Sequence, residues 1–142
     1  MPNRQVSDIV RDQKPLVLPA SATVKQACDR MRERRVGAVL VADQADRLVG
    51  IFTGRDAICR MLAEARNATE TTLGDVMTCD PSTMPPGRSA IEALRLMQDG
   101  GFRHIPVIDL DGKIVGVVSR GDFRGLEQAR LDEETGLFER IY

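Results

Sequence analysis

Apolar residues after Thr23 recur at i, i+3, i+4 and i+7, the spacing of one face of a helix. A threonine at that place can accept a hydrogen bond from a free amide of the first turn, so it suits the N-cap. The same pattern starts again at Ser89 and stops at Gly100-Gly101, where glycine commonly ends a helix. We therefore predict two amphipathic helices, whose apolar positions are Val24, Ala27, Cys28 and Met31 in the first and Ile91, Leu94 and Met97 in the second.

Two short apolar runs follow each of these helices, as expected for paired β-strands. In the second pair they are joined by Asp109-Leu110-Asp111-Gly112, whose Asp-Gly step favours a tight hairpin. A further helix is predicted after each pair of strands, and in the first copy its apolar stripe would consist of Ile58, Met61, Leu62 and Ala65. The predicted strands are Val36–Val41, Leu48–Phe52, Ile105–Ile108 and Ile114–Val118.

The order of these elements reflects an internal duplication. Residues 18–58 align without a gap with residues 84–124, a shift of 66 positions, and the motif Gly50–Asp56 recurs as Gly116–Asp122. Upstream, Val6–Val10 resembles Leu73–Met77 with a shift of 67. A unit of about 60 residues buries too little surface to be comfortably stable alone. The two copies are therefore expected to pack about a pseudo-twofold axis, with equivalent clefts at the seam.

The predicted fold class is α/β (α+β), with two β-α-β-β-α repeats. We divide the chain into a first repeat with its N-terminal segment (1–70), a second repeat (71–130) and a C-terminal tail (131–142). The polar stretch Asn67–Thr72 is expected to be the linker that crosses between the repeats. The tail, which ends in apolar and aromatic residues, is either docked on its own domain or part of an interface with a second chain.

Composition narrows the class of partner. The 142 residues carry 20 basic and 21 acidic side chains, and this net charge of −1 gives no reason to expect nucleic acid or a membrane surface as a partner. The apolar runs are too short to span a bilayer, and the N-terminus lacks a signal-peptide pattern. Cys28, Cys59 and Cys79 are widely spaced without a paired-ligand pattern, which favours reduced, mostly buried thiols in a cytoplasmic protein.

The duplicated strand-to-helix junction is the strongest candidate for a functional site. It reads Thr53-x-x-Asp56 in the first copy and Ser119-x-x-Asp122 in the second. Its simplest interpretation is a capping box, in which the hydroxyl and the carboxylate satisfy free amides of the first helical turn. A ligand-binding role is compatible with capping, because an ordered helix start holds the carboxylate in place.

Three features of the junction favour a ligand. The preceding glycine, Gly50 or Gly116, permits another group to approach the backbone closely. Free amides at the start of a helix favour an anion such as phosphate. Arg55 and Arg120 lie inside the two motifs, at positions that do not align with each other. Arg120 is either a phosphate ligand that bonds two oxygens or a solvated surface residue.

The repeats resemble the pair of cystathionine-β-synthase (CBS) domains that makes a Bateman module. The resemblance covers nearly the whole chain. It is carried by the Gly-x-x-Thr/Ser-x-x-Asp end of each copy, by Val76-Met77-Thr78 and by Phe102-Arg103-His104-Ile105-Pro106-Val107. It implies two β-α-β-β-α units that hold adenosyl ligands in the clefts between them.

The resemblance also implies roles for particular residues. Asp56 and Asp122 would accept hydrogen bonds from the ribose hydroxyls, and Thr53 and Ser119 would lie near the ribose and phosphate. The adenine would lie against the segments around Val17-Leu18 and Thr83-Met84, with Ala38–Leu40 in the first copy and His104–Pro106 in the second. Because only the second copy has this basic and proline-containing run, it is expected to be the tighter site. His104, the only histidine, is either a partly buried structural residue or a phosphate contact.

The sequence thus predicts a stand-alone regulatory module without catalytic activity, metal or required cofactor, which binds AMP, ADP, ATP or another adenosyl compound. A homodimer and an unidentified effector protein are the expected protein partners. The alternative is a ligand-free structural scaffold, whose clefts are filled by its own side chains. An enzyme is disfavoured because phosphate-loop, nucleophile and metal-ligand motifs are absent. The expected nucleotide-binding residues are Asp122, Ser119, Arg120, His104, Ile105, Pro106, Asp56, Thr53, Arg55 and Val39.

Overall fold

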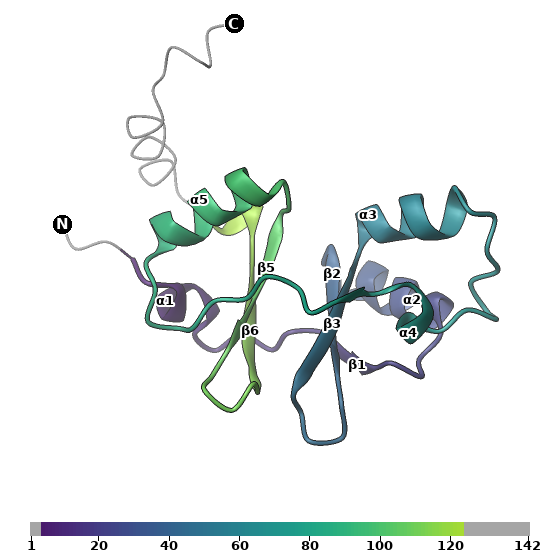
Figure 1. Cartoon of the computed structure of the whole chain (residues 1–142), viewed down its shortest axis with the longest axis horizontal. Coiled ribbons are helices and arrows are strands. Elements are labelled where there is room, and N and C mark those ends of the chain that lie inside the picture. The colour runs from purple at the N-terminus through teal and green to yellow at the C-terminus, as the bar shows by residue number, and fades with distance from the viewer. Residues whose placement is uncertain (1–3, 124–142) are drawn as a thin grey trace, which may run out of the picture.

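The computed structural model describes residues 4–123, which form two halves lying side by side (Figure 1). The first half contains β1 (Val17–Pro19), α2 (Val24–Arg34), β2 (Ala38–Ala42), β3 (Leu48–Thr53), the single turn α3 (Gly54–Asp56) and the π-helical turn η1 (Ala57–Leu62). The second half contains α5 (Ala90–Gly100), β5 (His104–Ile108), β6 (Ile114–Ser119) and the 3-10 turn η2 (Arg120–Asp122). Three short elements lie between and before these, namely α1 (Val6–Val10), α4 (Leu73–Val76) and β4 (Thr78–Cys79). The predicted mixed helix-and-strand fold is confirmed. The predicted helix after Asp122 and the tail 131–142 lie outside the described residues.

The strands of the two halves pair in the same register, as a duplication requires. Each half has an antiparallel hairpin, β2–β3 or β5–β6, and each hairpin has an irregularity at the same place. A preceding segment runs parallel to the first strand of each hairpin. The equivalent pairs, 66 positions apart, are Leu40–Ile51 with Pro106–Val117 in the hairpins and Leu18–Val41 with Met84–Val107 in the parallel pairing.

The halves are related by a pseudo-twofold axis. Arg47 forms an antiparallel bridge with Lys113, its own repeat equivalent. A residue that pairs with its own equivalent places the twofold axis between the two residues. Next to this bridge the Leu48 N–H donates to the carbonyl of Gly112 at 3.0 Å. An apolar layer across the seam hides surface that neither half could cover alone. This layer consists of Ala38, Leu40 and Ile51 with Leu48, Ile114 and Val117.

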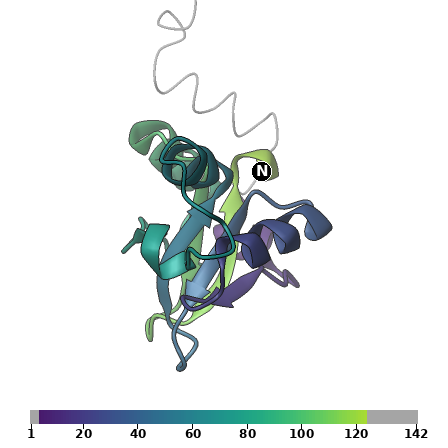
Figure 2. The ribbon, with the colours of Figure 1, turned by 90° about the vertical axis from the view of Figure 1, so that its right-hand side faces the viewer.

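Helices α2 and α5 begin at the predicted caps. The hydroxyls of Thr23 and Ser89 accept hydrogen bonds from amides of their first turns, at 3.1 and 3.2 Å. Both helices end in a left-handed residue, Gly101 at φ 72° and its repeat equivalent Arg35 at φ 54°. Glycine adopts this conformation without the strain that a side chain adds. Figure 2 shows the first half end-on, with α2 and α4 on opposite sides of the strands.

The short helices α1 and α4 are exchanged between the repeats. Val6 and Val10 of α1 pack in the core of the second half, together with α5, β5 and β6. Leu73 and Val76 of α4 pack in the core of the first half. Backbone hydrogen bonds also join each helix to the other repeat. The Val6 N–H donates to the carbonyl of Arg88 and the Leu73 N–H to that of Ala22, both at 2.8 Å. Each core is therefore completed by a segment that precedes the other repeat in sequence.

The prediction that Asn67–Thr72 crosses between the halves is wrong. Thr71 is buried, with 6% of its surface exposed, and its carbonyl accepts from the Val24 N–H at 2.9 Å, so this stretch packs on the start of α2. The chain crosses later, between β4 and Met84, which pairs with β5. A boundary at residue 70 therefore separates α4 from the half on which it packs.

Gly50 and Gly116 accommodate the exchanged segments. A Cβ at Gly50 would lie 2.5 Å from the sulfur of Met77, and one at Gly116 would lie 2.7 Å from Cβ of Val10. The close approach that the sequence predicted is therefore made by the protein's own chain, at both glycines. In the second half the side chain of Gln13 bonds to the backbone of Val117, with its amide donating at 2.9 Å and its carbonyl accepting at 2.7 Å. This amide takes the place that β4 has beside β3.

The predicted apolar stripe after Asp56 is wrong in part. Met61 is buried, but Ile58 and Leu62 are 61% and 77% exposed. The segment is π-helical, with the Ala63 N–H donating to Ile58 and the Arg66 N–H to Met61, five residues back. Turns of this width do not keep residues three and four apart on one face. Ala65, with φ 54°, lies beyond the end of the helix.

Candidate functional site

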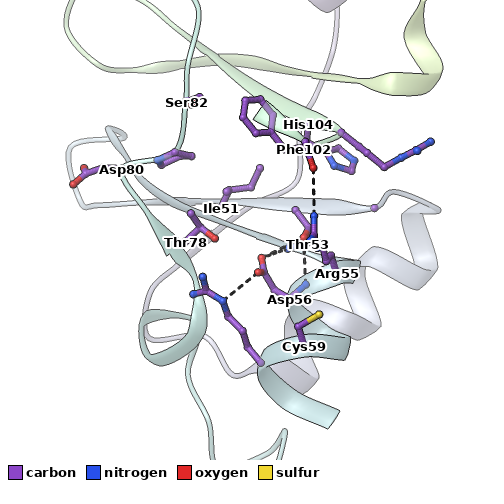
Figure 3. A pocket seen from close by; sticks show the side chains of 16 residues that line it. Ile51, Thr53, Arg55, Asp56, Cys59, Thr78, Asp80, Ser82, Phe102 and His104 are labelled. Atoms are coloured by element: carbon purple, nitrogen blue, oxygen red, sulfur yellow. Dashed lines mark hydrogen bonds and ion pairs between the residues drawn. The ribbon is translucent and has the colours of Figure 1, made fainter. Parts of the chain in front are cut away.

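A cavity of about 800 Å³ opens between the halves beside Asp56 (Figure 3). Its walls come from the β3–α3 junction with η1, from the crossing segment that starts at β4, and from the residues that lead into β5. Its volume lies within the usual range of small-molecule sites, about 300–1,000 Å³. The lining includes Ile51, Thr53, Arg55, Asp56, Cys59 and Arg60 from the first wall, Thr78, Asp80, Pro81 and Ser82 from the second, and Phe102, Arg103 and His104 from the third.

Asp56 is held by the capping box that the sequence predicts. Its Oδ2 accepts hydrogen bonds from the backbone N–H and the hydroxyl of Thr53, at 2.9 and 3.2 Å. In return the Asp56 N–H donates to the Thr53 hydroxyl at 3.4 Å. The side chain is 13% exposed and borders the cavity. A carboxylate has about four lone-pair positions, so Asp56 can still accept a hydrogen bond from a molecule in the cavity.

Arg60 fixes the other carboxylate oxygen of Asp56. Its Nε lies 3.4 Å from Asp56 Oδ1, and its Nη1 donates to the carbonyls of Val76 and Met77 at 3.1 Å each. Arg60 thus joins the junction to the segment that precedes the crossing. Sequence reasoning missed this residue, although its i+4 spacing from Asp56 is the signal for such a pair.

Arg55 reaches across the seam between the halves. Its Nη1 donates to the carbonyl of Gly101, which ends α5, at 3.3 Å (Figure 3). The guanidinium carries five donors, so a single bond of this length leaves most of its hydrogen-bonding capacity for other groups. The structure thus places Arg55, one of the expected ligand residues, at the cavity and links it to the other repeat.

His104 is half-buried at the cavity wall and belongs to the seam. A Cβ at Gly37 would lie 3.3 Å from both Cε1 and Nε2 of the imidazole, so the ring packs on the first half. Burial lowers the pKa of His104 below its ordinary value of 6.5, and the nearby charge of Arg103 lowers it further, whereas Asp122 opposes the shift. The sequence grouped His104 with the second junction, but the structure brings it to the cavity beside Asp56.

The lowered pKa of His104 predicts a loss of stability in mild acid. The unfolded chain takes up the proton first as the pH falls below about 6.5, so the free energy of unfolding decreases from there through the pKa of the folded protein. We expect urea unfolding at pH 7.5 and 5.5 to show a smaller decrease for His104→Gln than for the unchanged protein. Equal decreases, or an NMR titration that gives His104 a pKa above 6.5, would contradict this account.

The second junction has the same local geometry. Asp122 Oδ2 accepts from the backbone N–H and the hydroxyl of Ser119, at 2.7 and 3.2 Å, and the Asp122 carbonyl accepts from Arg4 at 2.9 Å. The backbone N–H of Arg120 donates to the carbonyl of Arg103 at 2.8 Å. The chain beyond Phe123 is outside the described residues, so the surroundings of this junction are described in part. The cavity of 800 Å³ borders Asp56, not the second junction that the sequence favoured.

Several of the expected ligand residues lie elsewhere. Val39 and Ile105 are fully buried in the cores of the first and second halves, and Pro106 is buried on β5. None of the three lines the cavity. Val39 and Ile105 occupy strand positions that face the cores, whereas Pro106, the next residue along β5, is buried on the opposite face of that strand. The cavity is instead lined by residues that the sequence did not predict as ligand contacts, mainly Thr78, Asp80 and Ser82 of the crossing segment. Of these, only Thr78 belongs to a motif of the resemblance, Val76-Met77-Thr78.

Comparison with known proteins identifies the family. The CBS domain matches residues 6–63 and 73–127, which is most of the chain. The protein therefore belongs to the CBS domain family and contains a tandem pair of these domains, as the duplicated register and exchanged segments also indicate.

Relatives of known sequence include large and small proteins. The chain is 38% identical over 109 residues to the CBS domain-containing protein CBSCBSPB1 of Arabidopsis thaliana, covering 77% of this chain but 20% of that protein. It thus spans about a fifth of the length of that relative. An uncharacterized 17.7 kDa protein of Acidianus ambivalens is 33% identical over 125 residues, which is 88% of this chain and 73% of that protein.

Solved structures share the fold. An uncharacterized protein from Pyrococcus horikoshii is 27% identical with a TM-score of 0.78, covering 90% of this chain and 93% of that one. The CBS domain protein PAE2072 from Pyrobaculum aerophilum, complexed with AMP, has a TM-score of 0.80 at 23% identity, covering 91% and 98% of the two chains. The CBS domain pair of MJ0100, in complex with 5′-methylthioadenosine and S-adenosyl-L-methionine, has a TM-score of 0.77 at 22% identity, covering 94% and 99%.

No group of three or more His, Cys, Asp or Glu side chains within residues 4–123 is arranged to hold a metal ion. None of the helices in this part of the chain is long and apolar enough to cross a membrane.

Proposed function

We propose that this protein is a non-catalytic regulatory module that binds an adenine nucleotide or a related adenosyl compound in the cavity beside Asp56. The observation that carries the proposal is the position of this carboxylate, which is held by Thr53 and Arg60 at the wall of a cavity between two CBS repeats. In this arrangement Asp56 accepts hydrogen bonds from the ribose hydroxyls. The adenine lies against the apolar lining, which includes Ile51 and Phe102.

Two structures with the same fold support the class of ligand. PAE2072 is complexed with AMP, and the MJ0100 domain pair is complexed with 5′-methylthioadenosine and S-adenosyl-L-methionine. Because both halves contribute walls to the cavity, the ligand would act by favouring one arrangement of the halves over another. It can shift the equilibrium between two arrangements only by the difference in its affinity for them. An effector protein would recognise the favoured arrangement.

Replacing Asp56 with asparagine tests the proposal. Hydrogen bonds to a charged group contribute about 1.5–3 kcal/mol each, so Asp56→Asn is expected to weaken binding of the tightest adenosyl ligand at least about tenfold. Isothermal titration with AMP, ADP, ATP and S-adenosylmethionine provides the measurement.

Asp75→Asn is the matched control. Asp75 has the same capping role, accepting from the Thr72 N–H at 3.1 Å, but it does not line the cavity. This variant is expected to bind as the unchanged protein does. Equal affinities in the Asp56 variant and the unchanged protein would remove Asp56 from the site. If none of the four compounds binds the unchanged protein, the ligand-free scaffold becomes the better description.

We also propose that two copies of the chain associate through η1. Ile58 and Leu62 are large apolar side chains on this element, yet 61% and 77% of their surfaces are exposed, so a second chain could cover them. An interface there would give the ligand a route to the arrangement of two chains. The free cysteines fit a reducing compartment such as the cytoplasm, but the prediction that they are mostly buried is wrong, because Cys59 and Cys79 are exposed.

Glutamate substitutions on η1 test the association. The double variant Ile58→Glu, Leu62→Glu is expected to have about half the mass of the unchanged protein by light scattering, because two buried charges per chain would oppose an apolar interface. Leu110→Glu is the control, since Leu110 is fully exposed at the tip of the β5–β6 hairpin. An unchanged mass for the double variant would exclude this surface.

A further inference from the structure

The charges that line the cavity are unevenly distributed. Arg60 and Asp56 neutralise each other, because they form an ion pair at 3.4 Å. The remaining charged lining residues are Arg55 and Arg103 against Asp80. Figure 3 shows Asp80 at one end of the cavity and Arg55 with His104 at the other. One end of the site is therefore cationic and suited to a negative group.

Arg55 is held at this end by a contact that an anion can improve on. Its acceptor is the neutral carbonyl of Gly101, at 3.3 Å on the exposed surface. A phosphate adds an opposite charge that the carbonyl lacks, and hydrogen bonds between a guanidinium and a phosphate are short and frequently bidentate. The Gly101 carbonyl thus positions Arg55 while leaving other guanidinium N–H groups available, and a phosphate in the cavity would be a better partner.

The duplication does not reproduce this arginine. Arg55 corresponds to Gly121 in the second repeat, whereas Arg120 corresponds to Gly54. Both repeats keep the Asp that would receive the ribose, so the two junctions differ in the residue next to it. The charge beside Asp56 is therefore a property of this one cavity and not of the repeated motif.

We propose that the cavity beside Asp56 selects phosphorylated adenosine over uncharged or cationic adenosyl compounds, and that Arg55 determines this selectivity by binding the phosphate. The inference rests on the proposed function and narrows it to a ligand class. S-adenosylmethionine would place its positive sulfonium group at the cationic end of the cavity, where it is repelled. Adenosine would occupy the same position without gaining the contact to Arg55.

The test compares AMP, adenosine and S-adenosylmethionine by isothermal titration at pH 7.5. The unchanged protein is expected to bind AMP at least about tenfold more tightly than either of the others, since a charge-assisted contact is worth about a factor of ten. Arg55→Gln is expected to weaken AMP binding by about the same factor and to change adenosine binding less than about twofold. The preference for AMP should also decrease with added salt, because this contact is exposed.

Arg32→Gln is the matched control, because Arg32 is 77% exposed on α2 and does not line the cavity. It removes the same charge and is expected to leave all three affinities unchanged.

Equal binding of AMP and adenosine by the unchanged protein would overturn the selectivity while leaving the proposed function intact, provided that Asp56→Asn still weakens both. An equal weakening of AMP and adenosine binding in Arg55→Gln would show that Arg55 acts only through its hydrogen bond to Gly101, and it would overturn the proposed contact with phosphate. Absence of binding by all three compounds would overturn both proposals.

Discussion

Leu73→Ala is expected to destabilise the first half of the molecule, although Leu73 lies in the segment that begins the second repeat. Leu73 is fully buried in the core formed with α2, β2 and β3. Truncating a buried leucine costs about 2–5 kcal/mol, through lost burial and the cavity that remains. Native-state hydrogen exchange should therefore show the largest loss of protection in β2 and β3.

Val6→Ala is the matched variant for the other half. Val6 is also fully buried, but in the core formed with α5, β5 and β6, and it is equivalent to Leu73 in the duplication. Removing two methyl groups there is expected to cost about 2 kcal/mol and to lower protection in β5 and β6 first. If each substitution instead affected the repeat to which it belongs in sequence, the exchange of α1 and α4 would be refuted.

Gly116→Ala is the second substitution with a large expected effect. The added Cβ would lie 2.6 Å from Oε1 of Gln13 and 2.7 Å from Cβ of Val10, so the exchanged N-terminal segment must move. Overpacking of this kind costs about 1–3 kcal/mol, and displacing Gln13 would also lengthen its two hydrogen bonds to Val117. We expect the thermal unfolding midpoint to fall by several degrees.

Gly87→Ala serves as the control for this experiment. No atom lies within 4 Å of a Cβ at Gly87, and its φ is not in the left-handed region. Its effect should stay within about 0.5 kcal/mol, as for most surface substitutions. A Gly116→Ala protein as stable as the Gly87→Ala protein would mean that the N-terminal segment does not pack against β6 as described.

Much of the fold follows from local signals in the sequence. Thr23 and Ser89 cap α2 and α5, and the shift of 66 residues predicts that both hairpins share one register. These features depend on residues that are near each other in sequence or on a repeat that can be read by alignment. The π-helical form of η1 could not be predicted in this way, because the spacing of Ile58, Met61 and Leu62 is also that of an α-helix.

The candidate site was predictable in its junction and not in its walls. Thr53 and Asp56 belong to one short motif whose local hydrogen bonds follow from capping, and Arg55 lies between them in sequence. His104 was identified as a candidate but was assigned to the second junction. The crossing segment was not predicted as a wall of the cavity. Thr78 ends the Val76-Met77-Thr78 motif but has no predicted contact, Asp80 and Ser82 belong to no motif, and all three reach the cavity only through the path of the chain.

The sequence by itself determined the duplicated strands and helices, their caps and the carboxylate at the end of each repeat, because these depend on short-range hydrogen bonds and on the periodicity of apolar residues. The tertiary structure decided which half each of α1 and α4 completes, where the chain crosses, and which junction borders the cavity. Val6 and Leu73 are both apolar, so the hydrophobic pattern marks each as a core residue without revealing which core it joins. The path of the chain between β4 and β5, which no local signal predicts, brings the crossing segment to the cavity beside Asp56.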